Sequence, residues 1–479
     1  MIHIKIQIVF VLLMTLGAIS CTSAKEKSKP KPNIIYILAD DLGYGELGCY
    51  GQEKIQTPCL DKMASEGIRF TNHYSGQTVC SPSRCSLMTG MHMGHASVKK
   101  NGVLLDASDV TVSELLKSEG YATCAIGKWG LAEGPLAANS PNQKGFDHWF
   151  GFDNQGFAHF YYPEFMWRNH DKVFYNENLN IRDENGYYIP GKGTYNHDEF
   201  TKEALGFIQE NKNKPFFLYL PYAIPHAELT VPEDSKEPYR KYQWPETPKT
   251  KPGYVNSNVK DQGYGSQYVE GYCCQDEPNI TYAAMVSRMD RDIGRIMDLL
   301  KKLDIDENTI IMFGSDNGPS NEGGQSMEFF NSSGGLRGAK RDLYEGGIRV
   351  PFIARWPGKI KAGVTTNHIS AFWDFLPTVC ELVGISIPDH VDGMSLLPTL
   401  LGNDAQQKQH KYLYWEWRNM QVLRVGKWKF FYMNSNKPDQ DPIYALYDLE
   451  RDIREQNNVA QQYPELIKTF LPYLQAARK

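Results

Sequence analysis

The sequence lacks the excess of basic residues that nucleic-acid-binding proteins carry. Its 51 Lys and Arg residues are set against 56 Asp and Glu residues, which gives a formal net charge of -5 at pH 7. Charges of both signs are mixed along the chain, so no basic stripe is available to follow a phosphate backbone. The composition therefore argues against a nucleic-acid partner.

Long apolar runs are also scarce. The run from Ile6 to Met14 is too short to span a membrane as a helix and is typical of an export signal. The segment Ala18-Ile19-Ser20-Cys21 after it resembles a relaxed bacterial lipoprotein box, and plain cleavage near Ala24 is the alternative. We therefore expect residues 1–31 to be a signal peptide and tether. The protein should be exported to the periplasm or cell surface, with Cys21 as a possible lipid anchor.

The cysteines are not spaced as a disulfide framework or a metal site would require. The spacing shows neither a metal-knuckle pattern nor the density of a disulfide scaffold. Adjacent Cys273 and Cys274 could bond each other only with strain. Most cysteines should therefore be buried thiols. The nine are Cys21, Cys49, Cys59, Cys80, Cys85, Cys124, Cys273, Cys274 and Cys380.

The order of strand-like and helical runs predicts an α/β protein. At 479 residues the chain exceeds what one hydrophobic core normally holds, so a large domain and a smaller one are expected. From residue 32 to 390 the two kinds of run alternate, which favours a doubly wound, mostly parallel sheet with helices on both faces. Residues 391–479 should form a smaller α+β domain with an antiparallel sheet. Its expected strands are Tyr412 to Trp417, Val422 to Tyr432 and Tyr444 to Leu449, followed by a helix from Pro464 to Ala477.

Two apolar strands end in acidic residues. The run from Pro32 to Ala39 is followed by Asp40 and Asp41, and the run from Thr309 to Ser315 by Asp316 and Asn317. Ligands of open α/β sheets gather at the carboxyl ends of the strands, and a buried acidic pair needs a positive partner there. Either pair alone could be a solvated turn. Together they form an oxygen-only set that suits Ca²⁺ or Mg²⁺ better than zinc.

Between these strands lies Cys80-Ser81-Pro82-Ser83-Arg84, followed by Thr89-Gly90. Serine before proline signals a helix start, so Cys80 should lie at a helix N-terminus, where the dipole favours a thiolate or a developing anion. A buried, inert cysteine is the alternative. The run resembles the signature of the type I sulfatases, in which this cysteine is converted to formylglycine (3-oxoalanine) by a maturation enzyme.

The resemblance spans roughly Asn33 to Ala460 and implies a fold and a metal. The fold implied is alkaline phosphatase-like. The metal is one Ca²⁺ held by Asp40, Asp41, Asp316, Asn317 and the formylglycine made from Cys80. Related phosphatases use two zinc ions and several histidines, and the sequence shows no such cluster.

The resemblance also implies the catalytic residues. Gly127-Lys128-Trp129 and the later Gly338-Ala339-Lys340 match the segments that supply two sulfate-contacting lysines, and His226 matches a sulfate-binding histidine that protonates the departing oxygen. Its ordinary pKa near 6.5 would let it carry a proton near neutrality. Arg84 would steady the aldehyde hydrate, and Asp316 would take a proton from it. His226 or Lys340 would then give a proton to the leaving alkoxide.

One position departs from the family pattern. Many sulfatases carry a histidine two residues after the first of these lysines, and this chain has Gly130. Another histidine, such as His92 or His95, could take its place in the folded protein. Alternatively, Asp316 or water could take the proton from the second hydroxyl group of the aldehyde hydrate.

A long, irregular stretch from 151 to 197 is rich in aromatic and polar residues. Such loops tend to be functional, and rings mixed with polar side chains suit sugars. The stretch resembles a subset of carbohydrate sulfatases, some acting on galactose-type sugars; a surface lid is the alternative. A polar insertion at 227–278 should form a second wall of the cleft. The candidate substrate contacts are His159, Trp167, Arg168 and Asn169.

We therefore expect an exported, calcium-dependent sulfuric ester hydrolase acting on a sulfated saccharide such as a galactose or N-acetylgalactosamine unit. An arylsulfatase of broad specificity and a phosphate or phosphonate ester hydrolase are the enzymatic alternatives. The remaining alternative, which applies if Cys80 stays a thiol, is a protein that binds sulfated glycans without catalysis.

Overall fold

The structure is a computed structural model that describes residues 31–179, 181, 189, 191–246, 276–434 and 440–478. From Lys31 onward the chain forms one compact unit. The predicted signal segment with Cys21 lies outside the described residues, as do Cys273, Cys274 and the middle of the predicted insertion. Within the described ranges, none of the helices combines the length and the apolar character that crossing a bilayer requires.

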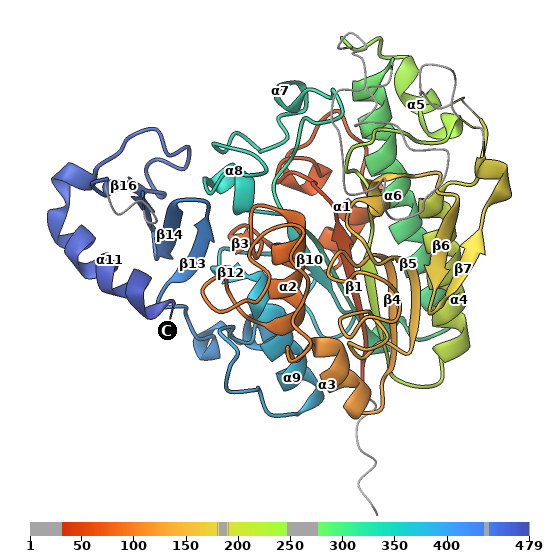
Figure 1. The fold of residues 1–479 in the computed structure, drawn as a ribbon, viewed down its shortest axis with the longest axis horizontal. Coiled ribbons are helices and arrows are strands. Elements are labelled where there is room, and N and C mark those ends of the chain that lie inside the picture. The colour runs from red at the N-terminus through yellow and green to blue at the C-terminus, as the bar shows by residue number, and fades with distance from the viewer. Residues whose placement is uncertain are drawn as a thin grey trace, which may run out of the picture. The chain divides into compact units, whose positions relative to one another are not determined.

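A large mixed sheet forms the centre of the fold (Figure 1). Its central strands β9, β1, β8, β4 and β5 run parallel to one another, whereas β10 and β6 flank them in antiparallel orientation. The prediction of a doubly wound, mostly parallel sheet is confirmed. The strands, in their order across the sheet, are β11 (Val364–Thr366), β2 (Ile68–Phe70), β10 (Phe352–Arg355), β9 (Thr309–Ser315), β1 (Asn33–Ala39), β8 (Phe216–Pro221), β4 (Ala122–Lys128), β5 (His148–Phe152), β6 (Phe165–Arg168) and β7 (Asp171–Phe174).

Strand β1 shows why the sheet needs helices on both faces. Every residue of β1 is buried, and alternate side chains belong to different cores. Ile35 and Ile37 pack into one core, while Ile34 and Tyr36 pack into the other. Because successive side chains of a strand point to opposite faces, an unbroken apolar run is stable only when both faces are covered.

Helices from distant parts of the chain supply the two covers. One core contains residues of α1 (Pro58–Ser65), α4 (Asn196–Asn211) and α6 (Pro278–Lys302). The other contains residues of α2 (Cys80–Thr89), α3 (Val112–Ser118) and α9 (Phe375–Val383). Short helices α5 (Glu237–Arg240), α7 (Met327–Phe330), α8 (Glu345–Ile348) and α10 (Leu397–Leu400), and the small strand pair β3 (His73–Tyr74) and β12 (Ser370–Ala371), complete the connections.

The stretch from 151 to 197 is less irregular than predicted. It contains the hairpin β6–β7, which extends the main sheet beyond β5. The sequence does not show this because β7 is largely exposed, so its residues lack the alternation of buried and exposed positions that marks a strand.

A smaller antiparallel sheet lies at the C-terminal end of the chain, as predicted. It consists of β13 (Leu413–Trp417), β14 (Met420–Val425), β15 (Trp428–Met433) and β16 (Ile443–Asp448), and helix α11 (Pro464–Ala476) follows it. The single strand expected from Val422 to Tyr432 was wrong: Gly426, with φ +54°, allows a tight turn that divides it into β14 and β15. The sheet shares the core that contains α2 and α9. The domain boundaries at residues 31/32 and 390/391 stay predictions.

Candidate active site

The two acidic strand ends meet at one edge of the sheet. Strands β1 and β9 are neighbours in register up to Ala39 and Ser315, so the residues that follow each strand lie side by side. The backbone N–H of Asp41 donates to Oδ1 of Asp316 over 3.1 Å, and Nδ2 of Asn317 donates to Oδ1 of Asp41 over 2.7 Å. All of these side chains are buried.

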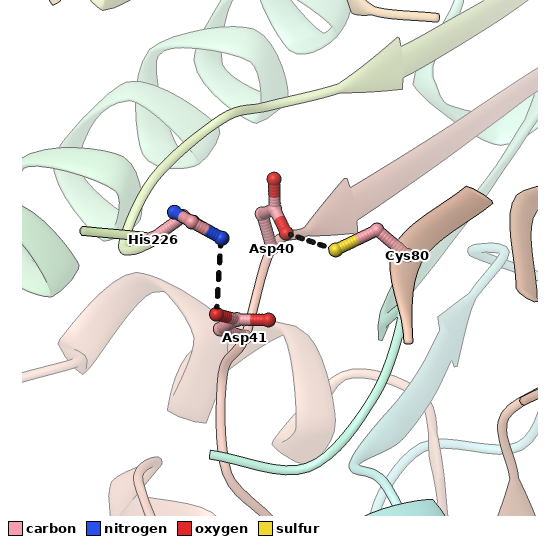
Figure 2. A group of neighbouring side chains, drawn as sticks. All are labelled: Asp40, Asp41, Cys80 and His226. Carbon is pink, nitrogen blue, oxygen red and sulfur yellow. Dashed lines mark hydrogen bonds and ion pairs between the residues drawn. The ribbon is translucent and has the colours of Figure 1, made fainter. Parts of the chain in front are cut away.

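Cys80 points into this cluster from the first residue of α2. Its thiol donates to Oδ1 of Asp40 over 3.4 Å, and Figure 2 shows the two aspartates between the thiol and the His226 ring. Burial and the neighbouring Asp40 carboxylate raise the pKa of Cys80 well above the ordinary value of a thiol. Burial beside an anion therefore outweighs the preference of the helix N-terminus for a thiolate, and a side chain that stays a thiol is a poor nucleophile.

Arg84 lies one helical turn after Cys80 and therefore on the same face of α2. Its guanidinium donates two hydrogen bonds to Oδ2 of Asp316, over 3.1 and 2.8 Å, and a third to the carbonyl of Lys128 over 2.7 Å. Arg84 is fully buried, so this bidentate pair fixes the carboxylate and the end of β4 together.

Two lysines bind the two aspartates, and each lysine also reaches a histidine. Nζ of Lys128, the last residue of β4, lies 2.5 Å from Oδ2 of Asp40 and 3.0 Å from Nε2 of His159. Nζ of Lys340 lies 2.7 Å from Oδ2 of Asp41 and 2.9 Å from Nε2 of His226. The two imidazole rings stack on each other with centroids 3.7 Å apart. We call these groups the Lys128 arm (Asp40, Lys128, His159) and the Lys340 arm (Asp41, Lys340, His226).

The lysines fix the protonation of both histidines. An ammonium group only donates hydrogen bonds, so each Nε2 must accept and the proton of each ring must be on Nδ1. Burial lowers the pKa of His226 to about 3, with the Lys340 charge adding to the effect. Burial, with the neighbouring cations such as Lys128 adding to it, holds the pKa of His159 well below its usual value. The expectation that His226 carries a proton near neutrality was therefore wrong, because it ignored the burial of the ring and the Lys340 charge beside it.

The donor set fits a hard divalent cation. Among the described residues, Oδ1 of buried Asn317 has no hydrogen-bond partner, although its Nδ2 is fully engaged. A buried amide oxygen without a donor is costly, and a cation would satisfy it. Burial and the neighbouring Asp40 raise the pKa of Asp316 to about 7, which is the behaviour of carboxylates crowded together without such an ion. Oxygen-only ligands favour Ca²⁺ or Mg²⁺.

The charges of the cluster balance before any ion binds. Because the protein supplies as many cations as carboxylates, a bound divalent cation would leave the site positive and ready for an anion. Burial raises the pKa of Asp40, but the surrounding charges, led by Lys128, outweigh burial and hold it below its usual value. The balanced groups are Asp40, Asp41, Asp316 and Glu322 against Arg84, Lys128, Lys340 and Arg341.

Three of the predicted substrate contacts do not reach this site. Strand β6 runs antiparallel to β5, so the chain passes from Trp167 beside Gly151 to Arg168 beside Phe150 and moves away from the edge that holds the cluster. Arg168 pairs there with Glu203, and the Asn169 side chain accepts from the backbone N–H of Trp149. The Trp167 ring packs on Phe165 and under the Lys172 ammonium of the β6–β7 hairpin. Of the four candidates, the structure brings only His159 to the cluster.

His92 and His95 do not replace the missing histidine at Gly130 either. Their rings stack on each other beyond the C-terminal end of α2, and Nδ1 of His95 lies 2.8 Å from Oδ1 of Asp392. The ten residues of α2, about 15 Å of helix, separate them from Cys80.

Two residues of the site were missed. Glu322 accepts from Nζ of Lys340 over 3.3 Å and from Arg341 over 2.6 Å, and the Gln155 side chain contacts the hydroxyl of Ser81. Both lie in connections after strands β9 and β5, where no local pattern distinguishes a site residue from a solvated loop residue.

Comparison with known proteins gives one consistent result. A family model described as Sulfatase matches residues 32–385, and one described as N-sulphoglucosamine sulphohydrolase, C-terminal, matches residues 338–479. An N-acetylgalactosamine-6-O-sulfatase of Bacteroides thetaiotaomicron is 29% identical over 94% of each chain, and arylsulfatase G of Rattus norvegicus is 30% identical over 92% of this chain and 85% of its own. The crystal structure of Ps i-CgsB in complex with k-i-k-neocarrahexaose is 26% identical, with a TM-score of 0.74 over 93% of this chain and 92% of that one.

Proposed function

The chain belongs to the sulfatase family, and we propose that it removes O-sulfate from a carbohydrate, a galactose or N-acetylgalactosamine unit of a glycan. Membership makes it a sulfuric ester hydrolase with an alkaline phosphatase-like fold. The observation that carries the proposal is the buried cluster in which Cys80, an unsatisfied Asn317 oxygen and two lysines converge. The saccharide substrate is supported by relatives named as N-acetylgalactosamine-6-sulfatases and by a carbohydrate complex of a structural neighbour.

The proposal includes conversion of Cys80 to formylglycine and one bound Ca²⁺, both general in the family. Formylglycine supplies a hydrated aldehyde, with two hydroxyl groups on one carbon, as the group that attacks sulfur. The raised pKa of the Cys80 thiol supports the need for conversion, which a maturation enzyme would perform. Asp40, Asp41, Asp316 and the free Asn317 oxygen would hold the cation, and it would supply charge stabilisation of the sulfate.

The chain's own residues can neutralise and orient the sulfate. The ammonium groups of Lys128 and Lys340 are each held by a carboxylate and a ring nitrogen, so neither needs to reorganise as charge develops on the sulfate oxygens. Lys340 is the proton donor of its arm, because His226 is neutral there and accepts through Nε2. We therefore assign protonation of the leaving sugar oxygen to Nζ of Lys340, with His226 as the group that orients it.

Export belongs to the proposal as well. The predicted signal segment and the box ending in Cys21 support a periplasmic or cell-surface location with a lipid anchor, where an enzyme acting on glycans from outside the cell would meet its substrate.

Replacing the nucleophile position tests the proposal. Cys80→Ala should abolish sulfate release from an aryl sulfate, while Cys85→Ala, which removes another buried thiol of α2, should keep it. In active wild-type protein, the intact mass should fall by about 18 Da on conversion of cysteine to formylglycine. Turnover retained by Cys80→Ala at an unchanged melting temperature would contradict the assignment.

The substrate class needs its own experiment. Sulfate release should be measured on singly sulfated galactose and N-acetylgalactosamine, with sulfated glucosamine and an aryl phosphate for comparison. The proposal expects release from the first two above the third, and slow hydrolysis of the phosphate. A preference for the aryl phosphate would favour a phosphate ester hydrolase, and binding of sulfated sugars by an unconverted, inactive protein would favour a glycan binder.

A further inference from the structure

The backbone beside Lys128 leaves a side-chain position empty. Gly130 has φ +72°, and a Cβ built there would lie 3.4 Å from Oε1 of Gln155 and 3.9 Å from both Arg84 and Lys128. A side chain at this position would therefore point at the catalytic cluster, yet the chain provides none. The polar groups on this side come instead from the segment that follows β5.

That segment is built to hold an imidazole in place. His159 ends a short 3-10 helix, Phe157–His159, whose residues are all buried. The turn before it is pinned by Asp153, which accepts from the backbone N–H of Gly134 over 2.6 Å, and by Asn154, which accepts from Gly156 over 2.7 Å. Only 6% of His159 is exposed, so its ring position is set by packing rather than by solvent.

We propose that His159 is the positioning residue of Lys128: its Nε2 and Oδ2 of Asp40 each accept one hydrogen of the ammonium group, so that the third hydrogen is directed at the bound sulfate. The inference rests on the sulfatase function proposed above and names a residue for it.

The geometry requires two acceptors for this purpose. A lysine ammonium carries three hydrogens on a rotor, and one acceptor fixes a single direction while leaving rotation about it free. With Asp40 at 2.5 Å and His159 at 3.0 Å, both in a buried site, the rotor has one orientation. An ammonium that is already oriented loses less entropy when the anion binds.

The stack on His226 adds a second constraint. The two rings lie 3.7 Å apart at an angle of 11°, so His159 is held between the ring of the Lys340 arm and the Lys128 ammonium. The lysines of both arms are thereby positioned by one ring pair, and a change that tilts His159 should be felt by both.

The acceptor and the ring can be separated by substitution. His159→Gln places an amide oxygen near the position of Nε2, His159→Asn places it near Nδ1 and out of reach, and His159→Phe keeps the stack without any acceptor. His148→Gln, which alters a half-buried histidine at the opposite edge of the sheet, is the control.

The positioning role is tested by measuring the binding of inorganic sulfate to each variant by calorimetry. A Cys80→Ala background with Ca²⁺ is used, so that binding is measured without turnover. We expect His159→Asn and His159→Phe to weaken sulfate binding about tenfold to hundredfold, which is the range for losing an oriented charge-assisted hydrogen bond. Gln should stay within about threefold of the parent, and kcat/KM of the converted enzymes should follow the same order. Melting temperatures identify any variant that has lost its fold.

Three outcomes of this experiment would contradict the positioning role of His159. Sulfate bound as tightly by folded Phe and Asn variants as by the parent overturns the positioning role and leaves the proposed function intact. Equal losses of sulfate affinity in the Gln, Asn and Phe variants of His159, with His148→Gln unaffected, also overturn the positioning role. An acceptor at the Nε2 position would then make no difference to sulfate binding. A parent that binds no sulfate at all overturns both this inference and the proposed function.

Discussion

The protein contains two buried ionic clusters that differ in how completely they are satisfied. The first is the active-site cluster described above. The second, which we call the Glu345 cluster, lies where α8 meets the C-terminal sheet. There Oε1 of Glu345 accepts from Lys429 over 2.9 Å, and Oε2 accepts from the hydroxyl of Tyr74 over 2.7 Å and from Arg349 over 3.3 Å. Glu455 completes the cluster by pairing with Lys429 at 3.2 Å.

The difference shows which feature of buried charge indicates function. Both clusters hold lysine, arginine and carboxylate groups shielded from water, so burial and charge alone do not separate them. In the Glu345 cluster both oxygens of Glu345 have donors. Oε1 of Glu455 has no hydrogen bond but lies 3.2 Å from the Lys429 ammonium, so each carboxylate of this structural cluster has a cationic partner. In the active site Asn317 keeps an acceptor that no described residue satisfies, at a sheet edge where ligands bind.

The largest effect should come from neutralising one ligand of the active-site cluster. Asp316→Asn keeps the shape but removes the charge that would hold the cation and that binds Arg84. We expect kcat/KM on an aryl sulfate to fall on the order of 10³ or more, with the circular dichroism spectrum unchanged. Asp392→Asn, which removes a carboxylate beyond the far end of α2, is the control and should keep its activity. Activity within about tenfold of wild type would show that Asp316 is not a required ligand.

The same change in the Glu345 cluster should affect stability instead. Glu345→Gln leaves Lys429, Arg349 and Arg424 buried with one negative partner fewer. We expect the free energy of unfolding to fall by about 3–5 kcal/mol in urea denaturation. Activity per folded molecule, measured well below the unfolding midpoint, should stay near the wild-type value. Lost activity at unchanged stability would erase the distinction between the clusters.

Calcium binding should stabilise the protein through the active-site cluster and not through the Glu345 cluster. At a free concentration of about 100 times its Kd, an ion that binds only the folded protein raises the free energy of unfolding by about 2.7 kcal/mol. We expect this increment in wild type and in Glu345→Gln, and its loss in Asp41→Asn, when urea curves in Ca²⁺ and in chelator are compared. An increment that survives Asp41→Asn would place the ion elsewhere.

The sequence could locate the active-site cluster because its ligands follow buried strands directly. Asp40 and Asp316 each come straight after an apolar run, and neighbouring parallel strands end at the same edge, so local patterns suffice to predict that they meet. The start of α2 at Cys80 was likewise predictable from Ser81 and Pro82, and the helix begins there.

The sequence could not show what depends on pairing between distant segments. Placing Arg168 and Asn169 away from the site requires knowing that β6 is antiparallel to β5, and periodicity carries no strand direction. The contact of His159 with Lys128 joins a 3-10 helix to the end of β4. The neutrality of His226 follows from its burial and from Lys340, more than a hundred residues further along the chain. The Glu345 cluster was not predicted at all, since its members lie in four separate segments with no shared pattern.

The smallest effect we predict is a pH dependence that belongs to the Glu345 cluster. Burial and the neighbouring Glu345 raise the pKa of Glu455 to about 7 from its ordinary 4.5, although Lys429 opposes the shift. Between these values the folded protein binds a proton that the unfolded chain has released. This contribution to stability is therefore complete below pH 4.5 and is lost as the pH rises towards 7 and beyond. In Glu455→Gln the loss of stability between pH 5 and 8 should be smaller than in wild type by on the order of 1–3 kcal/mol in urea-denaturation curves, while the calcium increment stays. A variant with the wild-type pH slope would show that another group titrates there, because the amide that replaces the carboxyl group has no proton to lose in this range.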